Sequence, residues 1–165
     1  MSPTRARLVH LSIALLVILV DRWTKRLAAA RIGMYSHIQI IPGFFRLTHT
    51  ENTGAAFSLF ADSPGRWKIE LLIGFSLVAM IIVSALLWKQ TRALTTTGIA
   101  LSLILGGAAG NFWDRVMSGR VVDFLLFYVK QYQWPVFNLA DSSIVIGACL
   151  LVIEILFTRQ ESIDS

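Results

Sequence analysis

Four carboxylates of this chain, those of Asp21, Asp114, Asp123 and Asp141, lie within or beside long apolar segments. On insertion scales an aspartate at the centre of a bilayer costs about 2.5–3.5 kcal/mol, so each carboxylate should face protein or a water-filled cavity. All four also fall near the same predicted membrane face. Their positions therefore indicate either ion pairs that hold a helix bundle together or a chemical site.

Two of these carboxylates have a cation close by in the sequence. Asp21 stands four residues before Lys25, a favourable spacing for an ion pair on a helix, and Asp114 is followed directly by Arg115. Asn111, three residues before Asp114, shares its helix face. We therefore interpret Asp21, Lys25 and Asp114 as structural polar residues of the bundle.

Asp123 and Asp141 lack such a partner, because the nearest cations in the sequence are Arg120 and Lys130. Two carboxyls about 3 Å apart cannot both ionise, so they share one proton. The ionised carboxylate can then take a proton from water, while the protonated one polarises a peptide carbonyl. The pair predicts an aspartyl peptidase, although membrane carboxylates also act as proton relays in transporters.

Other hydrolytic chemistries lack their residues. The sequence has neither an H-E-x-x-H zinc motif nor a G-x-S-x-G nucleophile elbow. His10, His37 and His49 are far apart, and we interpret the last two as loop residues rather than ligands. Cys149 is the only cysteine, which excludes a disulfide within the chain and a cysteine-based metal site. We expect no metal and no cofactor.

Two runs of small residues would let backbones approach closely. The first reads Asn52-Thr53-Gly54-Ala55-Ala56-Phe57-Ser58 and is either a simple turn or a segment over which a substrate backbone passes. The second reads Gly106-Gly107-Ala108-Ala109-Gly110 and lies within an apolar segment. Small residues in such segments usually form a helix-packing face, and we adopt that interpretation.

The elements that must position these residues are apolar helices. Hydrophobic residues make up 55% of the 165 residues and charged ones 15%, whereas soluble domains carry about 25% charge. We predict a single polytopic membrane domain over residues 1–165, with transmembrane helices at about 8–27, 69–88, 94–113 and 136–157. The net charge of +5 is spread between apolar runs and does not indicate nucleic-acid binding.

The first apolar run, Leu8–Val20, is too short to cross a bilayer alone, so its helix should continue through Asp21 to Lys25. A cleaved signal peptide is the alternative interpretation of this run. Charged residues separate it from the small residues at 28–30 where cleavage would fall, which favours the continuous helix.

Charge in the short loops indicates the orientation. With cytoplasmic termini, the cytoplasmic segments 1–7, 89–93 and 158–165 have the higher density of Lys and Arg, although the opposite side holds more of them in total. The positive-inside rule weights short loops most heavily. We therefore predict that both termini lie in the cytoplasm and that residues 21–68 and 114–135 lie outside.

Two segments outside the predicted spans are not simple linkers. Residues 38–41 and 44–48 are separated by Pro42-Gly43, which predicts a hairpin-like strand pair with a turn. Residues 121–128 are too few to span a membrane and too apolar to float freely. We expect the second segment to lie along the outer face, against the helices.

Five blocks of residues stand in order along nearly the whole chain: 21–25 (DRWTK), 52–58 (NTGAAFS), 106–115 (GGAAGNFWDR), 121–124 (VVDF) and 137–141 (FNLAD). They resemble the sequence blocks of the lipoprotein signal peptidases, also called signal peptidase II. The last two resemble the blocks that carry the catalytic aspartates of that family. Arg22 departs from the family, which usually has glutamine at this place, so the contact of that side chain stays open.

The resemblance implies an all-α membrane protein with four transmembrane helices, a small periplasmic β cradle and a short surface helix. It implies an intramembrane aspartyl endopeptidase that cleaves diacylglyceryl-modified bacterial prolipoproteins immediately before the lipidated cysteine. The catalytic residues would be Asp123 and Asp141. The residues that would bind substrate or brace the site are Asn52, Gly54, Ala56, Asn111, Arg115 and Asn138.

The implied location is the bacterial cytoplasmic (inner) membrane, with the active site near its outer face. The partners would be the prolipoprotein and membrane lipid, and we expect a monomer. Two other classes of function remain open from the residues alone. One is a small proton-coupled transporter or channel component, for which the sequence shows no obvious inverted repeat. The other is a structural assembly subunit, in which replacement of Asp123 would be silent.

Overall fold

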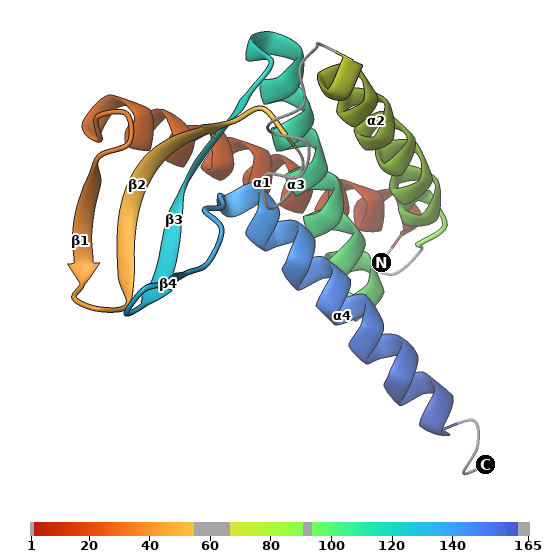
Figure 1. The fold of residues 1–165 in the computed structure, drawn as a ribbon. Coiled ribbons are helices and arrows are strands. Elements are labelled where there is room, and N and C mark those ends of the chain that lie inside the picture. The colour runs from red at the N-terminus through yellow and green to blue at the C-terminus, as the bar shows by residue number, and fades with distance from the viewer. Residues whose placement is uncertain (1, 55–66, 91–93, 162–165) are drawn as a thin grey trace.

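The computed structural model describes residues 2–54, 67–90 and 94–161, and it describes side chains as far as residue 157. Within these residues, helices and strands follow one another in the order α1, β1, β2, α2, α3, β3, β4, α4. The sheet lies at one end of the helices, and the two chain termini lie on the side away from it (Figure 1).

The helices are longer than the predicted spans and extend past them at one or both ends. Their bounds are Pro3–Arg31 for α1, Trp67–Trp88 for α2, Thr96–Ser118 for α3 and Leu139–Glu161 for α4. The continuation of the first helix beyond Asp21 and Lys25 is thus confirmed. Two helix ends carry clear signals: the Thr95 hydroxyl caps α3 by accepting from the backbone of Gly98, and Gly119 ends α3 at a φ of 70°.

Three of the described helices are long and apolar enough to cross a membrane: α1, α2 and the part of α4 from Leu139 to Phe157. Large apolar side chains point away from protein along them, as with Leu15, Phe75 and Ile155, each more than half exposed. α3 is not among these candidates, because small and polar residues interrupt its apolar stretch. The crossing of the membrane by residues 94–113 therefore stays a prediction.

α3 lies at the centre of the helices, in contact with α1, α2 and α4. Its small residues make this possible. A methyl group on Gly106 would come within 2.7 Å of the Ala14 carbonyl oxygen in α1. A methyl group on Gly107 would collide with the Ala140 carbonyl oxygen in α4. The packing interpretation of this small-residue run is confirmed on two sides of the helix.

The four strands form one antiparallel sheet in the order β1-β2-β3-β4. Their bounds are His37–Ile41, Phe45–Asn52, Val121–Val129 and Tyr132–Gln133. The predicted hairpin is confirmed, because β1 pairs with β2 across a turn in which Gly43 has a φ of 78°. His37 and His49, interpreted as loop residues, lie instead within β1 and β2.

The apolar segment at 121–128 forms β3, which pairs with β2 on one side and β4 on the other. Phe124 of this strand packs on Ala28 and Ile32 at the C-terminal end of α1, which places the sheet against the helices as expected. The predicted short surface helix is not among the elements of the described residues, and residues 55–66 lie outside them.

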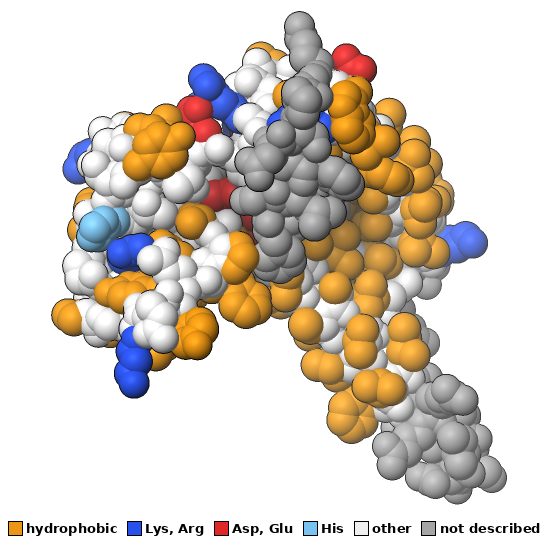
Figure 2. All heavy atoms as spheres, in the orientation of Figure 1, with side chains coloured by type: hydrophobic (Ala, Val, Ile, Leu, Met, Phe, Trp, Pro, Cys, Tyr) orange, Lys and Arg blue, Asp and Glu red, His pale blue; other side chains and the backbone are white. Residues whose placement is uncertain are grey.

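The two ends of the molecule differ in surface character. Figure 2 shows hydrophobic side chains over the visible faces of α2 and α4, and charged side chains mainly over the sheet and the nearby helix ends. The exposed apolar side chains along the helices suit a protein whose helices are embedded in lipid.

Candidate active site

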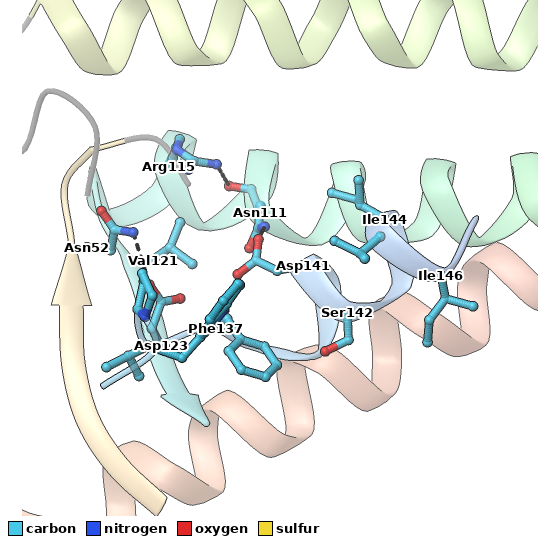
Figure 3. A pocket seen from close by; sticks show the side chains of 14 residues that line it. Asn52, Asn111, Arg115, Val121, Asp123, Phe137, Asp141, Ser142, Ile144 and Ile146 are labelled. Atoms are coloured by element: carbon cyan, nitrogen blue, oxygen red, sulfur yellow. Dashed lines mark hydrogen bonds between the residues drawn. The ribbon is translucent and has the colours of Figure 1, made fainter. Parts of the chain in front are cut away.

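Asp123 and Asp141 come from elements that are distant in sequence and meet at one cavity. Asp123 lies on β3, and Asp141 lies in the first turn of α4. Both line a cavity of about 450 Å³ between the sheet, α3 and α4. Their side chains point into the same space, with those of Asn52 and Asn111 beside them (Figure 3). The structure thus brings the two predicted catalytic residues together.

The carboxylate of Asp123 is held by two asparagine amides. Asn52 Nδ2 donates to Oδ2 at 3.0 Å, and Asn138 Nδ2 donates to Oδ1 at 2.6 Å. The residue is 3% exposed. Burial and the nearby negative charge of Asp141 raise the pKa of Asp123 to about 6, and the two amide donors oppose this rise. Asp123 therefore retains a proton at a pH where an exposed aspartate would have lost it.

The carboxylate of Asp141 is held by the helix start on which it stands. Asn138 caps α4: its Oδ1 accepts from the backbone N–H of Asp141 at 2.9 Å, and its own backbone N–H donates to Asp141 Oδ2 at 3.2 Å. Asn111 Nδ2 donates to the other oxygen, Oδ1, at 2.8 Å. Because these bonds are reciprocal, capping the helix also fixes the rotamer of the carboxylate.

Asn138 connects the two carboxyl groups. It is fully buried, its oxygen faces the Asp141 backbone, and its amide nitrogen therefore faces Asp123. Each of the four carboxyl oxygens thus accepts a hydrogen bond from a neutral N–H group. Among the described residues neither aspartate lies within ion-pair distance of a cation. Such a pair can share a proton, because no described cation contacts either group and holds it ionised.

Arg120, named above as one of the nearest cations in sequence, points elsewhere. Its guanidinium forms an ion pair at 2.9 Å with Glu51 on β2. The interpretation that Asp123 lacks a cationic partner is therefore confirmed for the part of the chain that the structure describes.

Asp21, Lys25 and Asp114, which were predicted to be structural, form a second polar cluster. Asn111 connects this cluster to Asp141. Lys25 Nζ donates to Asp21 Oδ2 at 2.7 Å, to Asp114 Oδ2 at 2.7 Å and to Asn111 Oδ1 at 2.8 Å. The predicted pair between Asp21 and Lys25 is confirmed. The pairing of Asp114 with Arg115 is wrong: Asp114 binds cations of α1 instead, because consecutive residues point to different sides of a helix.

Arg115 belongs to the cavity rather than to Asp114. Its Nη1 donates to the Asn111 carbonyl oxygen at 3.3 Å, and its Nη2 donates to the Gly54 carbonyl oxygen at 3.2 Å. It also lines the cavity that contains both aspartates. Arg115 thereby joins α3 to the residues after β2. Ala56, predicted to contribute to the same region, lies outside the described residues.

The rest of the cavity wall is mostly apolar, apart from Ser142, and was not predicted from the sequence. It comes from the segment before α4 and from one face of that helix, through Trp134, Pro135, Val136, Phe137, Ile144, Val145 and Ile146. One sequence feature could have identified the part of this wall that α4 contributes. Asp141 lies in the first turn of an apolar helix, so the residues one turn further along must lie beside it. A polar pair at one side and apolar side chains at the other suit a peptide that carries an apolar group.

Known proteins resemble this chain over nearly its whole length. A family model described as Signal peptidase (SPase) II matches residues 13–157. A lipoprotein signal peptidase of Solibacter usitatus (strain Ellin6076) is 42% identical over 150 residues, 91% of this chain and 92% of that protein. A lipoprotein signal peptidase of Francisella tularensis subsp. novicida (strain U112) is 39% identical over 98% of this chain and 100% of that protein. The chain belongs to the signal peptidase II family.

Solved structures agree with this membership. A bacterial membrane enzyme determined by the in meso method at 2.3 Å resolution has a TM-score of 0.81 and 32% identity, over 92% of this chain and 90% of that one. A second, determined at 1.9 Å, has a TM-score of 0.77 and 33% identity over 89% and 92%. The family makes the chain a protease that processes lipoprotein signal peptides, and an aspartyl mechanism is consistent with it.

The predictions of a protease, of lipoprotein processing and of a bacterial membrane location are thus confirmed at the level of the family. The family decides against a transporter or a structural subunit.

Proposed function

We propose that Asp123 and Asp141 are the catalytic dyad of this signal peptidase II and that they share one proton. The observation that carries the proposal is the Asn138 bridge, which donates to one oxygen of each carboxyl group, while neutral amides donate to the other two oxygens. Burial favours the protonated form of Asp123. In this assignment Asp141 takes a proton from the attacking water, and Asp123 donates a hydrogen bond to the scissile carbonyl oxygen.

The amides and Arg115 hold the dyad in place. Asn52, Asn111 and Asn138 supply the donors that fix the two carboxyl groups, so neither group has to reorganise when the water attacks. Arg115, which lines the cavity, holds the Gly54 carbonyl and so fixes Gly54 beside it. Gly54 and Ala56 would then leave space for the substrate backbone near the dyad.

The proposed substrate is a prolipoprotein whose cysteine carries diacylglycerol, and cleavage falls immediately before that cysteine. The apolar wall from Trp134 to Phe137 and along α4 offers a surface for the lipid and for apolar side chains of the signal peptide. No charged cluster other than the dyad and Arg115 lines the described cavity. Recognition of a charged sequence motif is therefore not expected there.

The lipid acts in this proposal by setting a depth. Substrate is already in the membrane before it binds, so most of the energy of burying its acyl chains is common to the free and bound states. A cysteine held at one depth brings the preceding peptide bond to the dyad in register, which speeds the reaction step. We place the sheet and the dyad near the outer face of the inner membrane, with four spans, cytoplasmic termini and a monomeric chain.

The test compares a lipidated precursor with the same precursor lacking the diacylglyceryl group, at equal density in the membrane. Purified enzyme should cleave the unmodified precursor far more slowly, mainly through a lower kcat, because its scissile bond is not held at one depth. Equal kcat values for the two substrates would refute positioning by lipid and leave the peptide as the determinant of specificity.

A further inference from the structure

Lys25 is a buried ammonium with three acceptors. It is 4% exposed, and its nitrogen donates to two carboxylates, those of Asp21 and Asp114, and to the carboxamide oxygen of Asn111. An ammonium has three hydrogens and no acceptor atom, so these contacts use its whole donor capacity. One of the three hydrogen bonds leads away from the ion pairs and toward the active site.

The third contact determines how the Asn111 carboxamide is oriented. Only the oxygen of a carboxamide can face an ammonium, so the NH₂ group must face the other way. There it donates to Asp141 Oδ1 at 2.8 Å. Asn138 also donates to the Asn111 oxygen, but at 3.3 Å and from a neutral group. The bond from Lys25 is shorter, at 2.8 Å, and charge-assisted, and charge-assisted bonds are roughly twice as strong.

A flipped Asn111 would present its oxygen to the carboxylate of Asp141. Two acceptors would then face each other in a buried place, and the side chain of Asp141 would lose the hydrogen bond that holds it in position. The lysine charge also reaches the dyad directly, since it opposes the rise in the pKa of Asp123. Lys25 therefore bears on both catalytic carboxyl groups without touching either.

We propose that Lys25 is a positioning residue of the peptidase, which acts by locking the Asn111 amide so that its NH₂ group holds Asp141. The proposal rests on the proposed dyad and adds a residue assigned so far only to holding helices together. A purely structural Lys25 would affect how much protein folds. A positioning Lys25 also sets the turnover of each folded molecule.

The test must avoid stranding a buried charge. Lys25→Met alone would leave Asp21 buried without its cation, which is strongly destabilising. The double variant Asp21→Asn with Lys25→Met removes both charges, and Asp114 keeps Arg22 at 3.6 Å. Asp21→Asn alone is the matched control, because Lys25 then keeps Asp114 and Asn111. The carboxamide of this asparagine can accept from Lys25 or from the backbone N–H of Ala140 but not from both, so the comparison is made per folded molecule.

The measurement is kcat and KM per folded molecule, under single-turnover conditions where rates are low. The double variant should lose about tenfold to a hundredfold in kcat relative to Asp21→Asn, with little change in KM, because misplacement of a catalytic group costs rates of this order. A double variant with the kcat of Asp21→Asn would overturn the proposal.

A double-mutant cycle identifies the route of the effect. If Lys25 acts through Asn111, adding Lys25→Met to a protein that already carries Asp21→Asn and Asn111→Ala should change kcat by less than about threefold. Asn52→Ala is the matched control, because Asn52 donates to Asp123 and is not among the contacts of Lys25. In the Asn52→Ala background the loss should keep its full size. An equal loss in both backgrounds would overturn positioning through Asn111.

The experiments distinguish an error in the proposed role of Lys25 from an error in the proposed catalytic dyad. Full activity after replacement of Asp123 or Asp141 would remove the dyad whatever Lys25 does. If the effects in the double-mutant cycle are additive and the enzyme still requires both aspartates, only the proposed role of Lys25 is refuted.

Discussion

Neutral amides, rather than cations, contact the carboxyl groups of Asp123 and Asp141. A cation at contact distance would favour ionisation and lower a carboxyl pKa by about 1–3 units, which would work against a shared proton. An amide N–H orients a carboxylate without adding a charge. Lys25 is separated from Asp141 by the Asn111 side chain. In the proposed mechanism, the site thus fixes the positions of the two carboxyl groups and leaves the shared proton on the pair.

This arrangement predicts a pH dependence with a defined sign. The pKa of Asp123 is raised to about 6, so the pair loses its shared proton as the pH rises through that value. Above it, kcat/KM should fall by about tenfold per pH unit, because the free enzyme lacks the acid. The pH profile of kcat/KM for purified enzyme checks this. A profile that stays flat to pH 8 would contradict the assignment of the proton.

The Asn52→Ala variant tests the same electrostatic explanation of the pH profile of kcat/KM. The amide of Asn52 lowers the pKa of Asp123 by bonding to its ionised form, so its removal raises that pKa. The alkaline limb of kcat/KM should therefore move to higher pH in the variant, and a shift to lower pH would count against the electrostatic account.

Local spacing predicted some of these contacts and missed others. The Asp21–Lys25 pair follows from four residues of helix and was predicted. The partner of Asp114 was predicted wrongly, because its cations lie on α1, more than eighty residues away in sequence. The bridge through Asn138 was not predicted for the same reason: it depends on where β3 meets α4.

Close packing between α3 and α4 sets the place of Asp141. Gly107 of α3 faces the Ala140 carbonyl, one residue before Asp141, with no room for a methyl group. Gly107→Ala should force the helices apart and lower the free energy of unfolding by about 1–3 kcal/mol, with a loss of activity. Gly74→Ala on α2 is the control, since a methyl group there meets nothing within 4 Å. Thermal unfolding in detergent would separate them, and equal stabilities would contradict this account of the packing.

The ion pairs that join α1 to α3 are expected to matter for folding more than for chemistry. Asp114→Ala removes a carboxylate that Lys25 and Arg22 share, which leaves positive charge partly buried. The yield of folded protein should fall more than the turnover of each folded molecule. The two quantities are measured by size-exclusion recovery and by specific activity. Normal thermal stability with complete loss of turnover would instead place Asp114 in the catalytic group.

The elements were predictable to different degrees. Long apolar runs predicted the helices α1, α2, α3 and α4, and Pro42-Gly43 predicted the β1–β2 turn. The segment at 121–128 was recognised as apolar and packed, but its role as the strand between β2 and β4 was not. Its apolar residues do not alternate cleanly with polar ones, and period-two alternation is the signal that identifies a strand. Strand order in a sheet depends on pairing between distant segments, which no local pattern records.

The whole molecule places the sheet at one end and the two termini on the other side (Figure 1). With cytoplasmic termini, the turn between β3 and β4 should be outside the cell membrane and the residues after α2 should be inside. Cys149→Ser removes the only cysteine, so single cysteines can report each side. Lys130→Cys should react with an impermeant maleimide in spheroplasts, and Lys89→Cys only after permeabilisation. The reverse pattern would invert the orientation.

The central claim is that Asp123 and Asp141 together perform peptide hydrolysis. Its most direct test is cleavage of a purified, lipidated prolipoprotein by Asp123→Asn, Asp141→Asn and the double variant, each verified as folded by thermal unfolding in detergent. Because both groups act as one unit, each single change should lower kcat by about a thousandfold or more, and the double variant should be hardly worse. Wild-type turnover in either folded single variant would contradict the account.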